Sequence, residues 1–197
     1  MDRRAALKTF LFGTTAIAGN AASGGLLETL ALADGRKVAL AKAVVLGDPN
    51  LCSGCRTCEV VCSNFNSQGK NSSSLSRLLV QKDPFKGDYR PKTCYQCSEP
   101  PCLEACPTGA LQIDSINRTY ARVIDQRACI GCQKCLAACG DYFDPPRPRF
   151  EAENQKVIKC HLCLGDPQCV KFCPLGALRL ERSETGLMIG YPIQREI

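Results

Sequence analysis

The stretch Cys52-Ser-Gly-Cys55-Arg-Thr-Cys58-Glu-Val-Val-Cys62 holds four cysteines separated by two, two and three residues. The same spacing returns in Cys129-Ile-Gly-Cys132-Gln-Lys-Cys135-Leu-Ala-Ala-Cys139. Two further groups have the spacings two, four, three and two, five, three, and in both the last cysteine precedes a proline. Their members are Cys94, Cys97, Cys102 and Cys106, then Cys160, Cys163, Cys169 and Cys173. The 16 cysteines of this 197-residue chain thus form four complete groups.

This spacing indicates iron–sulfur chemistry. Three cysteines at i, i+3 and i+6 in a tight loop can bind three corners of a cubic [4Fe–4S] cluster, and the fourth binds the other cluster in two-cluster ferredoxins. A zinc site typically uses two CxxC pairs and has no role for the third cysteine at i+6. Disulfides inside such short loops gain little closure entropy. A zinc or disulfide scaffold is the alternative, but four complete groups favour four [4Fe–4S] clusters.

Composition excludes a disordered or collagen-like chain, since 45% of the residues are hydrophobic and 22% are charged. The formal charge of +6 raises the question of nucleic acid or anionic membrane. Each cluster with its four thiolates carries net negative charge, so the loaded protein is slightly acidic and we expect no nucleic acid partner. The apolar core is lean, and loss of the clusters should therefore unfold the domain.

The N-terminus predicts an export signal over residues 1–33. Arg3 and Arg4, followed by Leu7 and Lys8, resemble a twin-arginine signal, and an apolar stretch interrupted by glycines ends in Ala31-Leu-Ala33. The alternative is an amphipathic N-terminal helix with a chance arginine pair. Free thiols would oxidise in the periplasm, so clusters should be inserted before export of the folded protein, as the twin-arginine route allows. No segment reaches the roughly 18 apolar residues of a membrane-spanning helix, so we expect a periplasmic protein attached to a membrane only through a partner.

An internal repeat predicts the fold class. Cys106-Pro-Thr-Gly-Ala-Leu111 matches Cys173-Pro-Leu-Gly-Ala-Leu178, and each should end a short helix, turn at glycine and begin a strand. β-Branched runs at 43–46 and 121–124 lead into the first and third groups. We expect hairpins between 111–113 and 122–124 and between 178–180 and 187–189. The prediction is an α+β fold of ferredoxin-like units with short helices, short hairpins and little regular secondary structure.

The four groups resemble the four-cluster iron–sulfur subunits of bacterial respiratory oxidoreductases. The likeness covers roughly residues 44–181 and is most specific in Cys97-Ser-Glu-Pro-Pro-Cys102-Leu-Glu-Ala-Cys106-Pro-Thr-Gly-Ala and in Cys160-His-Leu-Cys163. It implies one domain over 34–197, with an outer unit from groups 52–62 and 160–173 and an inner unit from 94–106 and 129–139. The implied ligand sets are Cys52, Cys55, Cys58 with Cys173; Cys160, Cys163, Cys169 with Cys62; Cys94, Cys97, Cys102 with Cys139; and Cys129, Cys132, Cys135 with Cys106. Pairing of groups one with two and three with four is the alternative.

The resemblance implies an electron-transfer subunit that relays single electrons between a molybdenum or tungsten catalytic subunit and a quinone-linked or cytochrome partner. A weaker likeness of Cys62-Ser-Asn-Phe-Asn66 to polyferredoxins of aldehyde ferredoxin oxidoreductase-like tungsten enzymes adds a candidate partner class. All four groups are complete, and no phosphate loop or nucleophile motif is present, so we expect no catalytic site on this chain. A free-standing electron shuttle or redox sensor, and a cysteine-rich metal-storage protein, are the alternative functions.

Other residues near the cysteines have less specific roles. Gly54 and Gly131 should adopt positive φ within their CxxC loops. The single histidine, His161, should be an exposed loop residue with a local hydrogen bond rather than an iron ligand, because no cysteine is missing. Aromatic residues beside the cysteines either shield clusters from water or fill the core; they are Tyr95, Tyr142 and Phe143. We expect surface loops at 63–76 and 144–149, each a candidate docking face.

Overall fold

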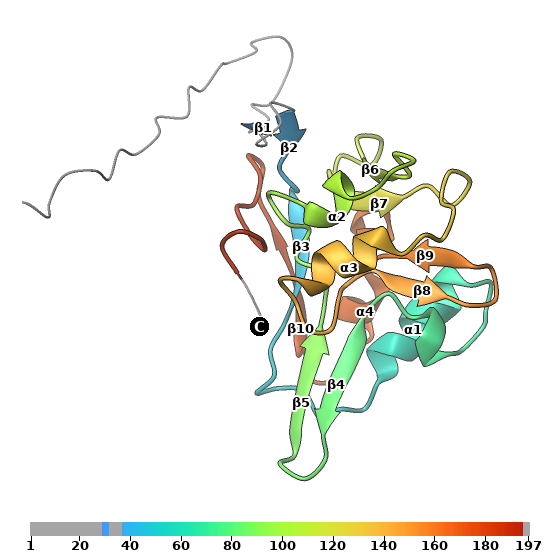
Figure 1. Cartoon of the computed structure of the whole chain (residues 1–197). Helices are drawn as coiled ribbons and strands as arrows, with labels where there is room; N and C mark the ends of the chain where they lie inside the picture. Colours follow the sequence, from blue (N-terminus) through green and yellow to red (C-terminus); the bar gives the residue numbers. More distant parts are fainter. Residues whose placement is uncertain (1–28, 32–36, 195–197) are drawn as a thin grey trace, which may run out of the picture.

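The computed structural model describes residues 29–31 and 37–194. Within them the chain forms five separate two-stranded antiparallel sheets and short helices (Figure 1). The strands are β1 (Thr29–Ala31), β2 (Lys37–Ala39), β3 (Ala43–Gly47), β4 (Leu79–Asp83), β5 (Asp88–Lys92), β6 (Leu111–Ile113), β7 (Arg122–Ile124), β8 (Arg149–Glu151), β9 (Lys156–Ile158) and β10 (Leu178–Arg182). The α-helices are α1 (Thr57–Asn66), α2 (Pro101–Glu104), α3 (Lys134–Gly140) and α4 (Gln168–Lys171), with 3₁₀ turns at Ser73–Leu75 and Leu162–Gly165. The predicted class, short helices with small antiparallel hairpins, is confirmed.

Residues 43–113 and 122–182 repeat one order of elements. Each half runs strand, cysteine group, helix, hairpin, cysteine group, short helix and strand, with β3 and α1 equivalent to β7 and α3. The turn after the first strand is the same in both halves. The Asp48 amide donates to the Ala177 carbonyl at 2.7 Å, and the Asp125 amide to the Ala110 carbonyl at 2.8 Å. Both aspartate side chains then accept from the amide two residues on, at 2.9 Å.

The two halves intertwine because their strands pair across the repeat. β3 pairs with β10, with Val45 opposite Leu180, and β6 pairs with β7, with Leu111 opposite Ile124. The helix–glycine–strand turns that the sequence predicts are present, with φ of 65° at Gly109 and 63° at Gly176. The predicted 111–113/122–124 hairpin is therefore confirmed. The β3–β10 pair brings the first and fourth cysteine groups together, although they are far apart in sequence (Figure 1).

The predicted hairpin between 178–180 and 187–189 is wrong. Residues 178–182 pair with the buried strand β3, which offers five partners, and residues 187–189 form no strand. The C-terminal segment instead crosses the second cysteine group. The Ser98 amide donates to the Ile189 carbonyl at 2.9 Å, and the Glu99 amide to the Tyr191 carbonyl at 3.2 Å. A β-carbon at Gly190 would lie 2.7 Å from Cys97 Sγ, so this segment covers that thiol closely.

The two predicted surface loops are not simple solvated loops. Helix α1 continues to Asn66, and Ser63 and Ser76 are fully buried. In the proline-rich segment 144–149, Arg147 is 5% exposed and Pro148 is among the buried side chains. The polar sequence of the first segment is misleading, because the serine hydroxyls form hydrogen bonds with backbone groups, which allows the serines to be buried. Both segments pack over a cysteine, as described below.

Two small hydrophobic clusters make up the core, and cysteines belong to both. One contains Val45, Leu78 and Leu162 together with Cys58 and Cys169. The other contains Leu111 and Val157 together with three buried cysteines. In the described part of the chain, no helix has the length and apolar character that crossing a membrane requires. Of the predicted leader, residues 29–31 form β1, paired with β2, and the rest, including Arg3 and Arg4, lies outside the described residues.

Glycine is required at 131 by both conformation and space. Gly131 has φ of 71°, and a β-carbon there would lie 2.1 Å from the Gln155 carbonyl oxygen, whereas Gly109 has φ of 65° with open space around it. We expect Gly109→Ala to cost about 1–2 kcal/mol from backbone strain alone, and Gly131→Ala to cost a further 1–3 kcal/mol or so from the clash. Denaturant unfolding of the protein as isolated measures both. Equal losses in the two variants would contradict this account of the CxxC loop.

Candidate iron–sulfur sites

Cysteines from opposite ends of the chain surround one cavity. Its volume is about 340 Å³, and its walls include Cys52, Cys55 and Cys58 from the first group and Cys173 from the fourth. This volume includes space that opens to solvent. Burial, then the negative charges of Glu59 and Cys173, raise the pKa of Cys58 to about 12. These four cysteines are one of the ligand sets expected from sequence.

Two more cavities have the same construction. One, of about 320 Å³, is lined by Cys94, Cys97, Cys102 and Cys139. The other, of about 310 Å³, is lined by Cys106, Cys129, Cys132 and Cys135. Each combines three cysteines of one group with the last cysteine of another. The structure thus brings together cysteines of the second and third groups, as expected for the inner unit of groups 94–106 and 129–139.

The remaining four cysteines are also neighbours. Burial raises the pKa of Cys169, and repulsion from Cys160, Cys62 and Cys163, in that order, raises it further. All 16 cysteines are described, and all are free thiols. Among the described residues, no three Cys, His, Asp or Glu side chains lie close enough together to hold a single metal ion. Twelve of the thiols instead line three cavities in sets of four.

A left-handed residue sits at the second position between the first two cysteines of every group. It is Gly54 or Gly131 in the first and third groups, as predicted, and Gln96 or Leu162 in the others, with φ of 53° and 58°. This conformation turns the loop so tightly that successive thiols face inward. A non-glycine residue is disfavoured there, and both exceptions are fully buried. Packing therefore holds Gln96 and Leu162 in the conformation that glycine adopts freely.

Backbone amides donate to the last cysteine of three groups. The Arg77 amide donates to Cys62 Sγ and the Arg147 amide to Cys139 Sγ, both at 3.3 Å, and the Leu111 amide donates to Cys106 Sγ at 3.5 Å. Cys62 and Cys139 lack a following proline, and both are buried beneath the segments that the sequence assigned to surface loops. The Arg147 amide thus comes from the predicted loop 144–149, and the Arg77 amide directly follows the predicted loop 63–76. Hydrogen bonds to sulfur are among the factors that set the potential of an iron–sulfur cluster.

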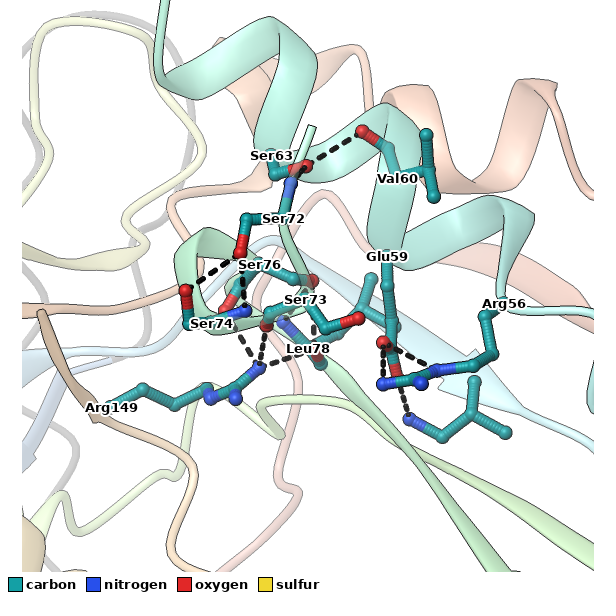
Figure 2. A network of polar contacts seen from close by, with 11 residues as sticks. Arg56, Glu59, Val60, Ser63, Ser72, Ser73, Ser74, Ser76, Leu78 and Arg149 are labelled. Atoms are coloured by element: carbon teal, nitrogen blue, oxygen red, sulfur yellow. Dashed lines mark hydrogen bonds and ion pairs between the residues drawn. The ribbon is translucent and has the colours of Figure 1, made fainter. Parts of the chain in front are cut away.

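A polar network fixes the segment over Cys62 (Figure 2). Arg149 Nη1 donates to the carbonyls of Ser73, Ser76 and Leu78 at 2.8–3.2 Å. Beside it, the fully buried Glu59 forms an ion pair with Arg56 at 2.7 Å and accepts from the Val80 amide at 2.6 Å. One guanidinium thus organises three carbonyls of the turn that presents the Arg77 amide to Cys62.

A second network of buried polar groups joins the second and fourth cysteine groups. Gln96 donates from Nε2 to the Cys160 carbonyl at 3.1 Å, and its Oε1 accepts from the Arg122 amide at 2.8 Å and from Lys159 Nζ at 3.3 Å. Burial lowers the pKa of Lys159, but the thiolates of Cys94 and Cys102 raise it more, and the net shift is upward. Sequence reasoning missed these residues. The only signal was the position of Gln96 where the first and third groups have glycine.

The aromatic residues and the histidine beside the cysteines have different surroundings. Tyr95 and Phe143 line the Cys94 cavity with their ring centroids 5.4 Å apart, whereas Tyr142 packs on Tyr191 at 4.0 Å. His161 is half-buried rather than exposed, and its Nδ1 accepts from the Cys163 amide at 3.3 Å, so the expected local hydrogen bond is present. Burial, then the charge of Arg77, lower the pKa of His161 to about 4, and it is neutral at neutral pH.

The donor set fits a [4Fe–4S] cluster. Four thiolates around one cavity repel each other, and burial with this repulsion raises the pKa of several of them, to about 12 for Cys139 and about 11 for Cys135. A cationic core in the cavity removes this penalty and keeps the thiols deprotonated. Arg122 is fully buried at the Cys94 cavity, and its Nε has no hydrogen-bond partner among the described residues, as expected beside an anionic group that fills the space.

Removal of the Arg149 guanidinium tests the role of the network. We expect Arg149→Met to lower the free energy of unfolding by about 1–3 kcal/mol, because three carbonyls lose a charged donor, and to speed iron loss to a chelator. Arg179→Met is the matched control, since Arg179 is exposed and, in the described part of the chain, pairs with Glu181 alone. Chelator kinetics and denaturant unfolding measure the effect, and identical behaviour of the two variants would refute the assigned role.

Comparison with known proteins agrees with this chemistry. Residues 85–183 match the 4Fe-4S dicluster domain family, and residues 51–110 match a second family of the same description. The chain is 41% identical over 129 residues to the aliphatic sulfonate oxidoreductase polyferredoxin-like subunit of Pyrococcus furiosus, covering 66% of this chain and 70% of that protein. It is 32% identical over 163 residues to the formate dehydrogenase-O iron-sulfur subunit of Escherichia coli, covering 70% of this chain and 52% of that protein.

A solved structure, the active site complex BamBC of benzoyl coenzyme A reductase with zinc, aligns with a TM-score of 0.43 and 26% identity over 74% of this chain and 81% of that one. The family match covers half of this chain, and it includes all four cysteines of three of the four groups. From the sequence match and the thiols that face shared cavities, we conclude that the chain belongs to the 4Fe-4S dicluster domain family.

Proposed function

We propose that this protein is an electron-transfer subunit that carries four [4Fe–4S] clusters. The ligand sets are Cys52, Cys55, Cys58 and Cys173; Cys62, Cys160, Cys163 and Cys169; Cys94, Cys97, Cys102 and Cys139; and Cys106, Cys129, Cys132 and Cys135. The observation that supports them is that three of these sets each line one cavity of 310–340 Å³. Each cluster supplies a carrier for one electron at a time, and the chain holds, orders and insulates these carriers.

The helices suggest the order of the four sites. Helix α1 carries Cys58 of one set and Cys62 of the next, and α3 likewise carries Cys135 and Cys139. Four residues along a helix span about 6 Å, so each helix joins two neighbouring sites. The Gln96 amide links the two halves by its bond to the Cys160 carbonyl. The order is therefore the Cys52 site, the Cys160 site, the Cys94 site and the Cys129 site.

The two terminal sites are the ones open to partners. Cys55 and Cys132, one from each, are the exposed cysteines. Large apolar side chains next to these sites are exposed too, with Leu51 at 50%, Leu175 at 53% and Ile130 at 66%. The inner sites lie beneath the segments that cover Cys62 and Cys139. Electrons thus enter at one end and leave at the other.

We assign the partners by chemistry and likeness. Two relatives are named as subunits of an aliphatic sulfonate oxidoreductase and of a formate dehydrogenase, which supports a catalytic oxidoreductase subunit as one partner. We propose a molybdenum or tungsten enzyme, with an aldehyde ferredoxin oxidoreductase-like tungsten enzyme as one candidate, and a quinone-linked or cytochrome protein as the other partner.

We further propose export of the loaded protein by the twin-arginine signal of residues 1–33. Co-purification with a large molybdenum or tungsten subunit tests the complex against a free shuttle.

Iron content of paired cysteine variants tests the ligand sets. We expect about 16 iron and 16 sulfide per chain in protein prepared anaerobically, and about 12 of each in Cys62→Ala, Cys169→Ala and their double variant, because both residues serve one cluster. The control is Cys58→Ala with Cys62→Ala, which alters the same helix but two sets and should leave about 8 iron.

The two pairings of groups give different results in this experiment. If groups one and two shared clusters, Cys62 and Cys169 would serve different clusters, and their double variant would fall to about 8 iron. Zinc without sulfide in the unaltered protein would contradict the function itself.

A further inference from the structure

Three buried cations line the cavity of Cys94, Cys97, Cys102 and Cys139, namely Arg122, Lys159 and Arg147. Arg122 is 0% exposed and Lys159 is 3% exposed, and both line this cavity. Arg122 Nη1 donates to the Tyr120 carbonyl at 2.8 Å, and Lys159 Nζ donates to the Arg122 carbonyl at 2.7 Å and also to the Cys94 thiolate. Within the described residues, neither forms an ion pair with a carboxylate. Because an uncompensated buried charge is costly, the group that fills the cavity must supply the negative charge.

The equivalent positions in the other half of the repeat are neutral. Arg122 precedes Cys129 by seven residues, and the residue seven before Cys52 is Val45, which is 1% exposed. Lys159 directly precedes Cys160, and Thr93 directly precedes Cys94. The left-handed Gln96 that accepts from Lys159 is matched by Leu162. The repeat is thus close in backbone, but both cations line the Cys94 cavity, and Lys159 also stabilises the thiolate of the adjacent Cys160.

The charges around the first terminal site differ. The Cys52 cavity has Arg56 at its rim, but that side chain is 41% exposed and is neutralised by Glu59. Glu59 itself is fully buried and acts on Cys58 as a negative charge. The Cys129 cavity has no arginine or lysine among its lining residues. Of the three cavities, the one at Cys94 is therefore lined by two buried cations, Arg122 and Lys159, that form no ion pair with a carboxylate among the described residues.

We propose that Arg122 and Lys159 make the cluster at Cys94, Cys97, Cys102 and Cys139 the most readily reduced of the four. This inference rests on the proposed function. Reduction adds one electron to this site, taken from a neighbouring reduced cluster that is oxidised by one electron, and no proton is needed. Fixed cations stabilise the added negative charge, and more strongly in a buried site than in water. Arg122 and Lys159 are positioning residues that act on the cluster through its field and not as ligands.

Neutral replacements of Lys159 in the full-length, anaerobically prepared protein test the proposal. Lys159→Met removes the charge and the hydrogen bond, whereas Lys159→Gln removes the charge but can still donate to the Arg122 carbonyl. Potentiometric titration followed by electron paramagnetic resonance resolves the successive reduction steps. In both variants we expect the highest reduction potential to fall by about 59 mV or more. For one electron, this corresponds to at least a tenfold change in the ratio of reduced to oxidised cluster. The steps of the clusters at Cys52 and Cys129, whose cavities Lys159 does not line, should stay in place.

Two controls separate charge from structure. Lys159→Arg restores a cation and should restore the highest potential, and Lys86→Met removes an 81% exposed lysine at the tip of the β4–β5 hairpin and should change nothing. Iron and sulfide are measured on every sample. A full complement of clusters with an unchanged highest potential in both neutral variants overturns this inference alone. An unaltered protein with fewer than about 16 iron overturns the proposed function as well.

Discussion

Repulsion among buried thiolates is the constraint on which the rest of this structure depends. Twelve of the 16 cysteines line three cavities in sets of four, and burial with mutual repulsion raises the pKa of Cys58, Cys139 and Cys160 to about 12. A folded chain with these thiols and nothing between them would be unstable when they ionise. The proposed clusters supply the missing positive charge and replace much of the apolar core, because cysteines belong to both hydrophobic clusters. Helices as short as α2 and α4 are then sufficient, since the cysteines next to them are cross-linked through metal.

The intertwined repeat explains how one chain could place the four proposed sites in a row. Because β3 pairs with β10 and β6 with β7, every proposed set takes its fourth cysteine from a different group. Helices α1 and α3 each carry cysteines of two neighbouring proposed sets, so helix geometry would fix the distance between those sites. The backbone repeats, but the side chains at Arg122, Lys159 and Gln96 do not. A symmetric scaffold thus gives sites with different electrostatics.

The regular parts of this arrangement could be predicted from sequence because they depend on local rules. Cysteine spacing, the glycines at 54 and 131 and the β6–β7 hairpin each follow from short-range turn chemistry. The partner of β10 could not be found in this way, because the choice between β3 and residues 187–189 depends on which strand is buried. Ser63, Ser76 and Arg147 read as solvent-exposed, yet backbone hydrogen bonds allow their burial. Lys159 carries no local signal, because only the fold places it against Cys94.

The central claim is that the proposed clusters hold the fold together, and anaerobic removal of iron tests it most directly. The full chain is treated with a chelator, and near-ultraviolet circular dichroism and amide hydrogen exchange are recorded as iron leaves. The account predicts that tertiary signal and amide protection are lost in parallel with iron, because the thiols lose the charge that allows their burial. An iron-free chain that keeps its protected amides and its cooperative unfolding transition would contradict it.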